Sequence, residues 1–203
     1  MIIISHRVNT IVGLAATDPK YGVEIDVRGD GGKLLLTHDP VDLSKQYDNL
    51  DDYLKAYKHA FVIFNLKEAG YEKRVVELAA TYGIEEYFLL DVEFPYLYRA
   101  TRKEGVRKIA VRFSEAEPIE AVEAQMVDGV PLLDWVWIDT NTTLPLTADI
   151  VERLKPFKTA LVCPDRWGRP QDVPVYIEQM KTLGFKPDAV MTSPACMTLY
   201  EAW

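Results

Sequence analysis

The chain has 203 residues, of which 48 % are hydrophobic and 27 % are charged. This composition is typical of a folded globular protein and excludes a disordered chain. The formal net charge of −8 disfavours nucleic acid as a partner, because an acidic surface repels a phosphate backbone.

No apolar run approaches the roughly 18 residues that span a bilayer. The initial run Met1–Ile4 is too short for a secretory signal and no basic residue precedes it. We therefore expect a cytoplasmic protein without a membrane span.

Short apolar runs recur along the chain, and each has about the length of a strand that is covered on both faces. In chain order they are Ile2–Ser5, Gly22–Val27, Phe61–Leu66, Tyr87–Val92, Lys108–Phe113, Trp135–Asp139, Ala160–Cys163 and Ala189–Thr192. Segments of helical period lie between them, with cap and stop residues at their ends. These are Leu50–Lys58, Glu72–Tyr82, Pro95–Lys103, Glu117–Val127, Ala148–Leu154 and Val173–Leu183.

Alternating strands and helices predict a parallel sheet with right-handed crossovers. Eight such units predict an α/β fold, a compact (β/α)8 TIM barrel that forms a single domain over residues 1–203. Asn9–Tyr21 is short, so the first helix should be short or irregular. The Gly-rich turn in Gly29–Asp39 predicts a β-hairpin that ends in the apolar run Leu34–Leu36.

The chain has three histidines, and two of them close strands. His6 ends the first strand, and His38 ends the short strand after the Gly-rich turn. In a barrel the catalytic groups sit at the C-terminal ends of strands, where these two histidines are expected. His59 precedes a strand, so it falls at the opposite end and is interpreted as structural.

Glu24 and Asp26 are two residues apart on the second strand, which places both carboxylates on one face. Two adjacent carboxylates repel each other unless a cation lies between them. A hard divalent cation such as Mg²⁺ or Ca²⁺ takes oxygen ligands and would remove the repulsion. Alternatively, Arg7 or Lys67 satisfies the pair.

Three motifs follow one another in the first part of the chain: His6-Arg7, Glu24-Ile25-Asp26 and His38-Asp39-Pro40. This order resembles the glycerophosphodiester phosphodiesterase family of the phosphatidylinositol-phospholipase-C-like barrels. Asn49–Leu54 looks like the helix-opening segment that this family has before its third strand. The remaining two-thirds of the chain match the family only in the rhythm of strands and helices.

The resemblance implies a phosphoric diester hydrolase that acts on a small phosphodiester with a divalent cation, Mg²⁺ or Ca²⁺. It implies that Glu24 and Asp26 hold the metal, that Arg7 holds a phosphate oxygen, and that His6 and His38 act as general acid and base. Neither histidine can be assigned to one role. Lys67 and Arg112, the latter on the fifth strand, are further candidates for binding phosphate.

Two departures from the family pattern concern the site. Asn65 stands where the family has its third metal-binding glutamate, and an amide oxygen brings no charge. Asp91, Glu93 and Asp139 are alternative ligands. In addition, the family inserts a subdomain before the third strand, whereas residues 41–60 alone separate Pro40 from that strand here. A more open site would accept a bulkier phosphodiester, such as a lipid or glycan phosphate.

Two other functions are compatible with the same sequence. A catalytically impaired barrel would bind phosphorylated ligands without hydrolysing them, with Asn65 marking the lost metal site. A sugar-phosphate isomerase or aldolase could use Lys67 as a Schiff-base lysine, but the last strand is not followed by a Gly-rich phosphate loop. The oligomeric state is not encoded in any pattern that we recognise.

Overall fold

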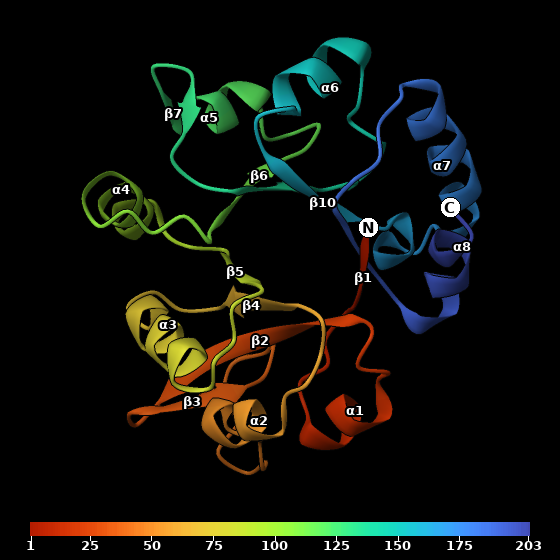
Figure 1. The fold of residues 1–203 in the computed structure, drawn as a ribbon. Helices are drawn as coiled ribbons and strands as arrows, with labels where there is room; N and C mark the ends of the chain where they lie inside the picture. Colours follow the sequence, from red (N-terminus) through yellow and green to blue (C-terminus); the bar gives the residue numbers. More distant parts are fainter. The chain divides into compact units, whose positions relative to one another are not determined.

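The computed structural model describes all residues, Met1–Trp203, and the chain divides into two compact units. The N-terminal unit comprises Ile4–Tyr96, and the C-terminal unit comprises Met1–Ile3 together with Leu97–Trp203. Strand β1 (Ile2–Ser5) therefore contributes its first residues to one unit and its last residues to the other (Figure 1). The single domain predicted for residues 1–203 stays a prediction.

The N-terminal unit is built around parallel strands in the order β5-β4-β2-β1. A hairpin adds β3 antiparallel to β2. The elements, red to yellow in Figure 1, are α1 (Ile11–Ala16), β2 (Gly22–Asp30), β3 (Lys33–Leu36), α2 (Leu50–Ala56), β4 (Val62–Leu66), α3 (Glu72–Thr81) and β5 (Tyr87–Leu90). Helix α2 packs against both α1 and α3.

The C-terminal unit repeats this arrangement with parallel strands in the order β11-β10-β9-β6. Its elements are α4 (Phe94–Lys103, which begins in the N-terminal unit), β6 (Ala110–Phe113), α5 (Ile119–Glu123), β7 (Met126–Val127), β8 (Val130–Pro131), β9 (Trp135–Ile138), α6 (Ala148–Leu154), β10 (Lys158–Val162), α7 (Val173–Thr182), β11 (Ala189–Thr192) and α8 (Met197–Glu201). Three 3₁₀ helices supplement them: η1 (Pro164–Trp167), η2 (Pro170–Asp172) and η3 (Pro194–Cys196).

Local sequence explains where the helices begin and end. The side chains of Thr10, Asn49 and Thr147 cap α1, α2 and α6 by accepting hydrogen bonds from backbone N–H groups of the first turn. Gly83 and Gly184, after α3 and α7, have left-handed backbones with φ values of +66° and +64°. Glycine adopts this conformation without steric cost, so both helices end there.

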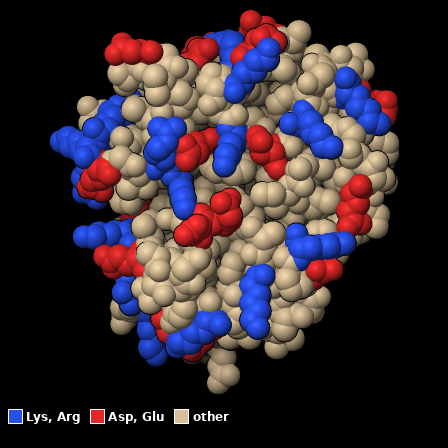
Figure 2. Space-filling view, in the orientation of Figure 1, with Lys and Arg blue, Asp and Glu red and all other residues tan.

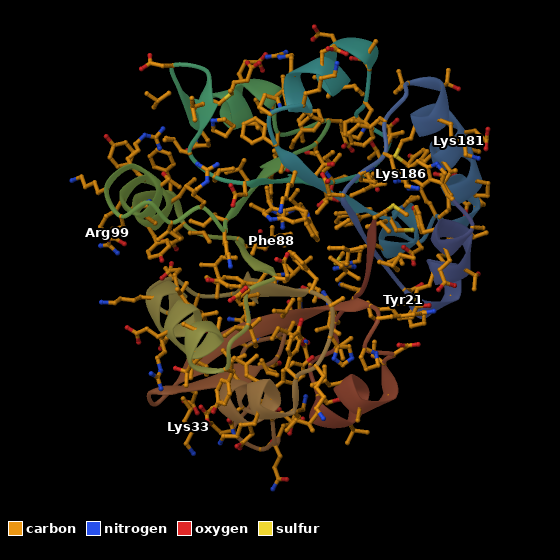
Figure 3. All side chains as sticks on the ribbon, in the orientation of Figure 1. Tyr21, Lys33, Phe88, Arg99, Lys181 and Lys186 are labelled. Atoms are coloured by element: carbon orange, nitrogen blue, oxygen red, sulfur yellow. The ribbon has the colours of Figure 1, made fainter.

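The central strands are buried on both faces, as their continuous apolar runs predict. Every residue of β4, β5, β9 and β11 is buried. In the N-terminal unit, Phe88 (Figure 3) packs against Phe61 with ring centroids 5.6 Å apart. None of the helices is long and apolar enough to cross a lipid bilayer.

Charged side chains of both signs lie next to one another on the face that Figure 2 shows. Many charged residues of the chain form exposed pairs one helical turn apart, such as Lys55 with Asp51 and Lys181 with Glu178, each at 2.7 Å. Exposed pairs of this kind stabilise a fold by less than about 1 kcal/mol. The packed strands, rather than these pairs, hold the fold together.

All eight predicted strands are present, with ends that shift by up to three residues, and α1 is short, as expected. The hairpin predicted in Gly29–Asp39 is also confirmed, since β3 pairs with β2. The helix predicted over Glu117–Val127 is wrong in its second half. It ends at Glu123, and the chain then forms the β7–β8 hairpin, in which Asp128 and Gly129 have positive φ. The helix at Met197–Glu201 was not predicted.

A buried tyrosine connects α2 to the segment that follows β1, and its removal should destabilise the fold. The Tyr53 hydroxyl donates a 2.8 Å hydrogen bond to the Val8 carbonyl, and the Tyr53 side chain is fully buried. Tyr53→Phe leaves that carbonyl without a donor, so we expect the free energy of unfolding to fall by about 1–3 kcal/mol. Denaturant unfolding measures this loss.

The matched control for this variant is Tyr82→Phe. It removes a hydrogen bond of the same kind, from the Tyr82 hydroxyl to the exposed Asp51 carboxylate. Water can replace that bond, so the expected change stays within about 0.5 kcal/mol. Equal losses in the two variants would contradict the argument from burial.

Candidate active site

The polar residues of the predicted site lie on, or directly after, the parallel strands β1, β2 and β4 of the N-terminal unit. Glu24 and Asp26 are on β2, and Asp26 is directly opposite Asn65 of β4 in the strand register. His6 and Arg7 follow β1. The two carboxylates are almost completely buried, with residue exposures of 1 % and 0 %. Burial of two such groups requires compensating partners.

Glu24 has a partner for each carboxylate oxygen. Its Oε2 accepts a 2.8 Å hydrogen bond from the Arg7 backbone N–H, and its Oε1 accepts one of 2.8 Å from the Asn65 amide. The His6 Nε2 atom lies 3.9 Å from Oε2. Burial, and secondarily repulsion by Asp26, raises the pKa of Glu24 to about 7, although these two hydrogen bonds oppose the shift.

Arg7 adopts a left-handed backbone with a φ of +56°. A residue with a Cβ atom rarely adopts this conformation without a functional or structural reason. Here it accompanies the backbone hydrogen bond to Glu24, while the guanidinium Nε lies 3.9 Å from Asp26 Oδ2. Arg7 thus contacts both carboxylates, one through its backbone and the other through its side chain.

Asp26 is held by an asparagine that sequence analysis missed. The Asn9 amide donates a 2.8 Å hydrogen bond to Asp26 Oδ2, and Asn9 Oδ1 accepts a 2.8 Å bond from the Asp26 backbone N–H. Lys67 Nζ lies 3.1 Å from Asp26 Oδ1 and 3.8 Å from Asp91 Oδ2. The sequence left open that Arg7 or Lys67 neutralises the carboxylate pair. In the structure both cations lie close to Asp26.

His38 is positioned through its backbone. Arg28 donates hydrogen bonds of 3.2 and 3.0 Å to the His38 carbonyl and is itself paired with Glu68 at 2.9 Å. His38 Nδ1 lies 3.0 Å from Asp39 Oδ1. Because a carboxylate only accepts hydrogen bonds, Nδ1 carries the proton, and Nε2 of the neutral ring has a free lone pair. The His38 side chain is 40 % exposed, so solvent or a ligand can reach it.

Two buried oxygen atoms of the site have no hydrogen-bond donor: Asp26 Oδ1, whose approach by Lys67 does not have hydrogen-bond geometry, and Asn65 Oδ1. Oxygen atoms are the ligands that Mg²⁺ and Ca²⁺ prefer, and Glu24 adds a further carboxylate beside them. The donor set therefore fits a hard divalent cation, with one negative charge fewer than three carboxylates would supply.

The remaining predicted residues have other partners. Arg112 is on β6 in the C-terminal unit and pairs with Asp139 at 3.0 Å, so its role in phosphate binding stays a prediction. Asp139 also accepts a 2.9 Å hydrogen bond from Trp167. His59 Nε2 contacts the Thr17 carbonyl at 3.0 Å, in line with its structural interpretation.

Two solved structures share this fold over nearly the whole chain. A glycerophosphodiester phosphodiesterase from Agrobacterium tumefaciens str. C58 superposes with a TM-score of 0.64 at 16 % identity, covering 96 % of this chain and 97 % of that one. A glycerophosphoryl diester phosphodiesterase from Parabacteroides distasonis ATCC 8503 gives a TM-score of 0.65 at 11 % identity, covering 98 % of this chain and 86 % of that one.

No protein-family model and no curated protein sequence matches the chain. The similarity to the two phosphodiesterase structures therefore concerns the fold. It confirms the predicted α/β fold of the (β/α)8 TIM-barrel type and the structural resemblance to glycerophosphodiester phosphodiesterases.

The raised pKa of Glu24 should make stability depend on pH. Between about pH 4.5 and 7 the unfolded chain releases the Glu24 proton while the folded protein keeps it. The free energy of unfolding should therefore fall as pH rises through this range, by up to about 3 kcal/mol. Denaturant unfolding in chelator at several pH values measures the slope, and Glu24→Gln should flatten it.

Glu77→Gln is the control for this prediction, because Glu77 lies on α3 with about half of its side chain exposed. It should keep the slope of the unmodified protein. An identical pH profile for Glu24→Gln and the unmodified chain would mean that Glu24 titrates normally.

Proposed function

We propose that the protein is a phosphodiesterase that hydrolyses a small phosphodiester with a divalent cation. The observation that carries this proposal is the pairing of the Glu24 and Asp26 carboxylates with Arg7, Lys67 and His6 at the ends of adjacent strands. The similarity of the fold to two phosphodiesterase structures supports it.

Two cations are available for a phosphate group. The Arg7 side chain is about one-third exposed, and its planar fork matches two oxygens of a phosphodiester. Lys67 supplies a compact second charge and is mostly buried against Asp26 and Asp91. A phosphodiester bound between these side chains would replace the hydration of its single negative charge with fixed positive groups.

The two histidines supply proton transfer. One accepts the proton of the attacking hydroxyl, either of water or of the substrate itself, as the new P–O bond forms. The other donates a proton to the leaving alkoxide as the old P–O bond breaks, so that charge and protons balance. Asp39 orients the His38 ring through Nδ1, and the His6 Nε2 atom lies 3.9 Å from Glu24 Oε2.

Glu24, Asp26 and Asn65 would hold the cation, through two carboxylates and one amide oxygen. When bound, a divalent cation polarises a phosphoryl oxygen and neutralises developing charge. Asn9 orients the Asp26 carboxylate through its two hydrogen bonds, as outer-sphere partners of metal ligands do.

One observation favours a second candidate function, a barrel that binds phosphorylated ligands without turnover. Asn65 supplies no charge, and its amide nitrogen donates to Glu24, so the ligand set is weaker than three carboxylates. The two candidates differ in whether a bound phosphodiester is cleaved.

The test is hydrolysis of glycerophosphocholine and bis(p-nitrophenyl) phosphate with Mg²⁺, Ca²⁺, Mn²⁺ or EDTA. We expect turnover that EDTA abolishes. His6→Ala and His38→Ala should each lower kcat by at least about 100-fold, since each removes a proton-transfer group.

His59→Ala is the matched control, because this third histidine contacts only the Thr17 carbonyl among the polar contacts described above. It should keep the rate of the unmodified protein. Full activity in His6→Ala, or no turnover of either substrate with any of the metals, would refute the phosphodiesterase. Calorimetric binding of glycerol phosphate without turnover would then establish the second candidate.

A separate variant tests the role of Asn65. Asn65→Glu adds the third carboxylate, and we expect the calorimetric Kd of the divalent cation to fall at least about tenfold, or about 1.4 kcal/mol. Asn65→Gln controls for side-chain length and should not tighten binding. Equal affinities in all three proteins would mean that position 65 does not contact the cation.

A further inference from the structure

A second cluster of ligand-type side chains lies in the C-terminal unit, separate from the residues discussed so far. It consists of Cys163, Asp165 and Cys196, whose two sulfur atoms and one carboxylate oxygen all lie within 4.8 Å of one another. Both cysteines are free thiols and both are buried. Thiolates and carboxylates are both ligands that metal ions take in proteins.

The backbone fixes the two cysteines at the ends of neighbouring parallel strands. Cys163 directly follows β10, and its N–H donates a 2.9 Å hydrogen bond to the Met191 carbonyl of β11. Cys196 is the last residue of η3, the short helix after β11, and its N–H donates a 3.1 Å hydrogen bond to the Ser193 carbonyl. Because β10 and β11 are paired, residues far apart in sequence meet here.

Asp165 is oriented toward the cluster by its other oxygen. Its Oδ2 accepts a 2.9 Å hydrogen bond from the Ser193 N–H and one of 3.3 Å from the Thr192 hydroxyl. Its Oδ1 is buried and has no hydrogen-bond donor. One oxygen is thus anchored while the other is left as an unused acceptor beside two thiols.

Tyr200 provides an independent observation. Its side chain is 1 % exposed, and its hydroxyl is buried without a hydrogen-bond partner of regular geometry. Burial raises the pKa of this hydroxyl, and the neighbouring Cys163, Asp165 and Cys196 raise it further. An unsatisfied buried hydroxyl costs free energy, and it gains a strong acceptor if a neighbouring thiol becomes a thiolate.

We propose that Cys163, Cys196 and Asp165 form a binding site for Zn²⁺. Zinc takes tetrahedral sets of thiolate and carboxylate ligands. At Zn–S bonds of about 2.3 Å, two sulfurs lie about 3.8 Å apart. The three ligand atoms, all within 4.8 Å of one another, are therefore close to the spacing that zinc requires. The partly exposed Asp165 gives the ion access from solvent.

Binding exchanges protons for metal without any redox step. Each thiol releases its proton to solvent and forms one S–Zn bond, and Asp165 Oδ1 forms an O–Zn bond. Three negative ligands and Zn²⁺ leave a net charge of −1, and the Tyr200 hydroxyl would stabilise it by donating a hydrogen bond to a thiolate. Water completes the fourth position.

The site would cross-link two segments that are joined through the hydrogen bonds of Asp165 with Ser193 and Thr192. One is η1, which carries Asp165, and the other is the C-terminal stretch from η3 through α8. The chain end is tied by Lys186 (Figure 3), whose Nζ donates a 2.7 Å hydrogen bond to the Trp203 carbonyl. Zinc would attach the same stretch at its start.

The test uses Co²⁺ as a spectroscopic probe of the reduced, metal-free full-length chain. We expect one equivalent of Co²⁺ to produce the thiolate-to-cobalt charge-transfer band and the intense visible bands of tetrahedral cobalt. One equivalent of Zn²⁺ should remove both. Cys163→Ser and Cys196→Ser should each lose most of the charge-transfer intensity, and Asp165→Asn should weaken Co²⁺ binding about 10–100-fold.

Glu77→Gln is the control, because Glu77 is an exposed carboxylate on α3 that belongs to neither candidate site, so this variant should keep the full band. The absence of the band in the unmodified protein overturns the proposal, whether or not any variant folds. A band that persists in both cysteine variants overturns it as well. Neither result depends on phosphodiester hydrolysis, so the two proposals can fail separately.

Discussion

The structure around the candidate active site depends on the burial of two like charges side by side. Glu24 and Asp26 lie two residues apart on a fully buried stretch of β2, where neither has access to water. Their repulsion must be offset by groups from other segments. Arg7 and Asn9 after β1, with Asn65 and Lys67 at the end of β4, provide this offset. The carboxylate pair therefore determines which side chains the neighbouring strands must present, and it links the chemistry of the site to the stability of the unit.

Sequence patterns predict the positions of the strands well, because buried strands appear as clear apolar runs. The runs at Ile2–Ser5 and Ala189–Thr192 match β1 and β11 residue for residue. The i, i+2 spacing of Glu24 and Asp26 places them on one face, and the register with β4 brings Asn65 opposite Asp26. The histidine positions follow from strand ends in the same way. The features that depend on residue alternation and strand length can therefore be predicted from the sequence.

The sequence does not show interactions that bring unrelated segments together. Asn9 looks like a loop residue, yet it makes two hydrogen bonds with Asp26. Arg28 looks like an exposed strand residue, yet it holds the His38 carbonyl. No local pattern identifies such partners, since they are chosen by three-dimensional proximity. The end of α5 was missed for another reason: Glu117–Val127 keeps helical periodicity, while Asp128-Gly129 makes a tight turn that favours a hairpin instead.

The division of β1 between the two units has a consequence for how the chain folds during synthesis. The Ile2 N–H donates a 2.7 Å hydrogen bond to the Asp188 carbonyl, although the two residues are 186 positions apart (188 − 2). Residues made early in synthesis are thus held by residues made much later. All other strands of the N-terminal unit precede Leu97, so that unit can pair its strands early. The C-terminal unit has to wait for β11, and until then Met1–Ile3 stays an open edge that a chaperone or a second nascent chain can reach.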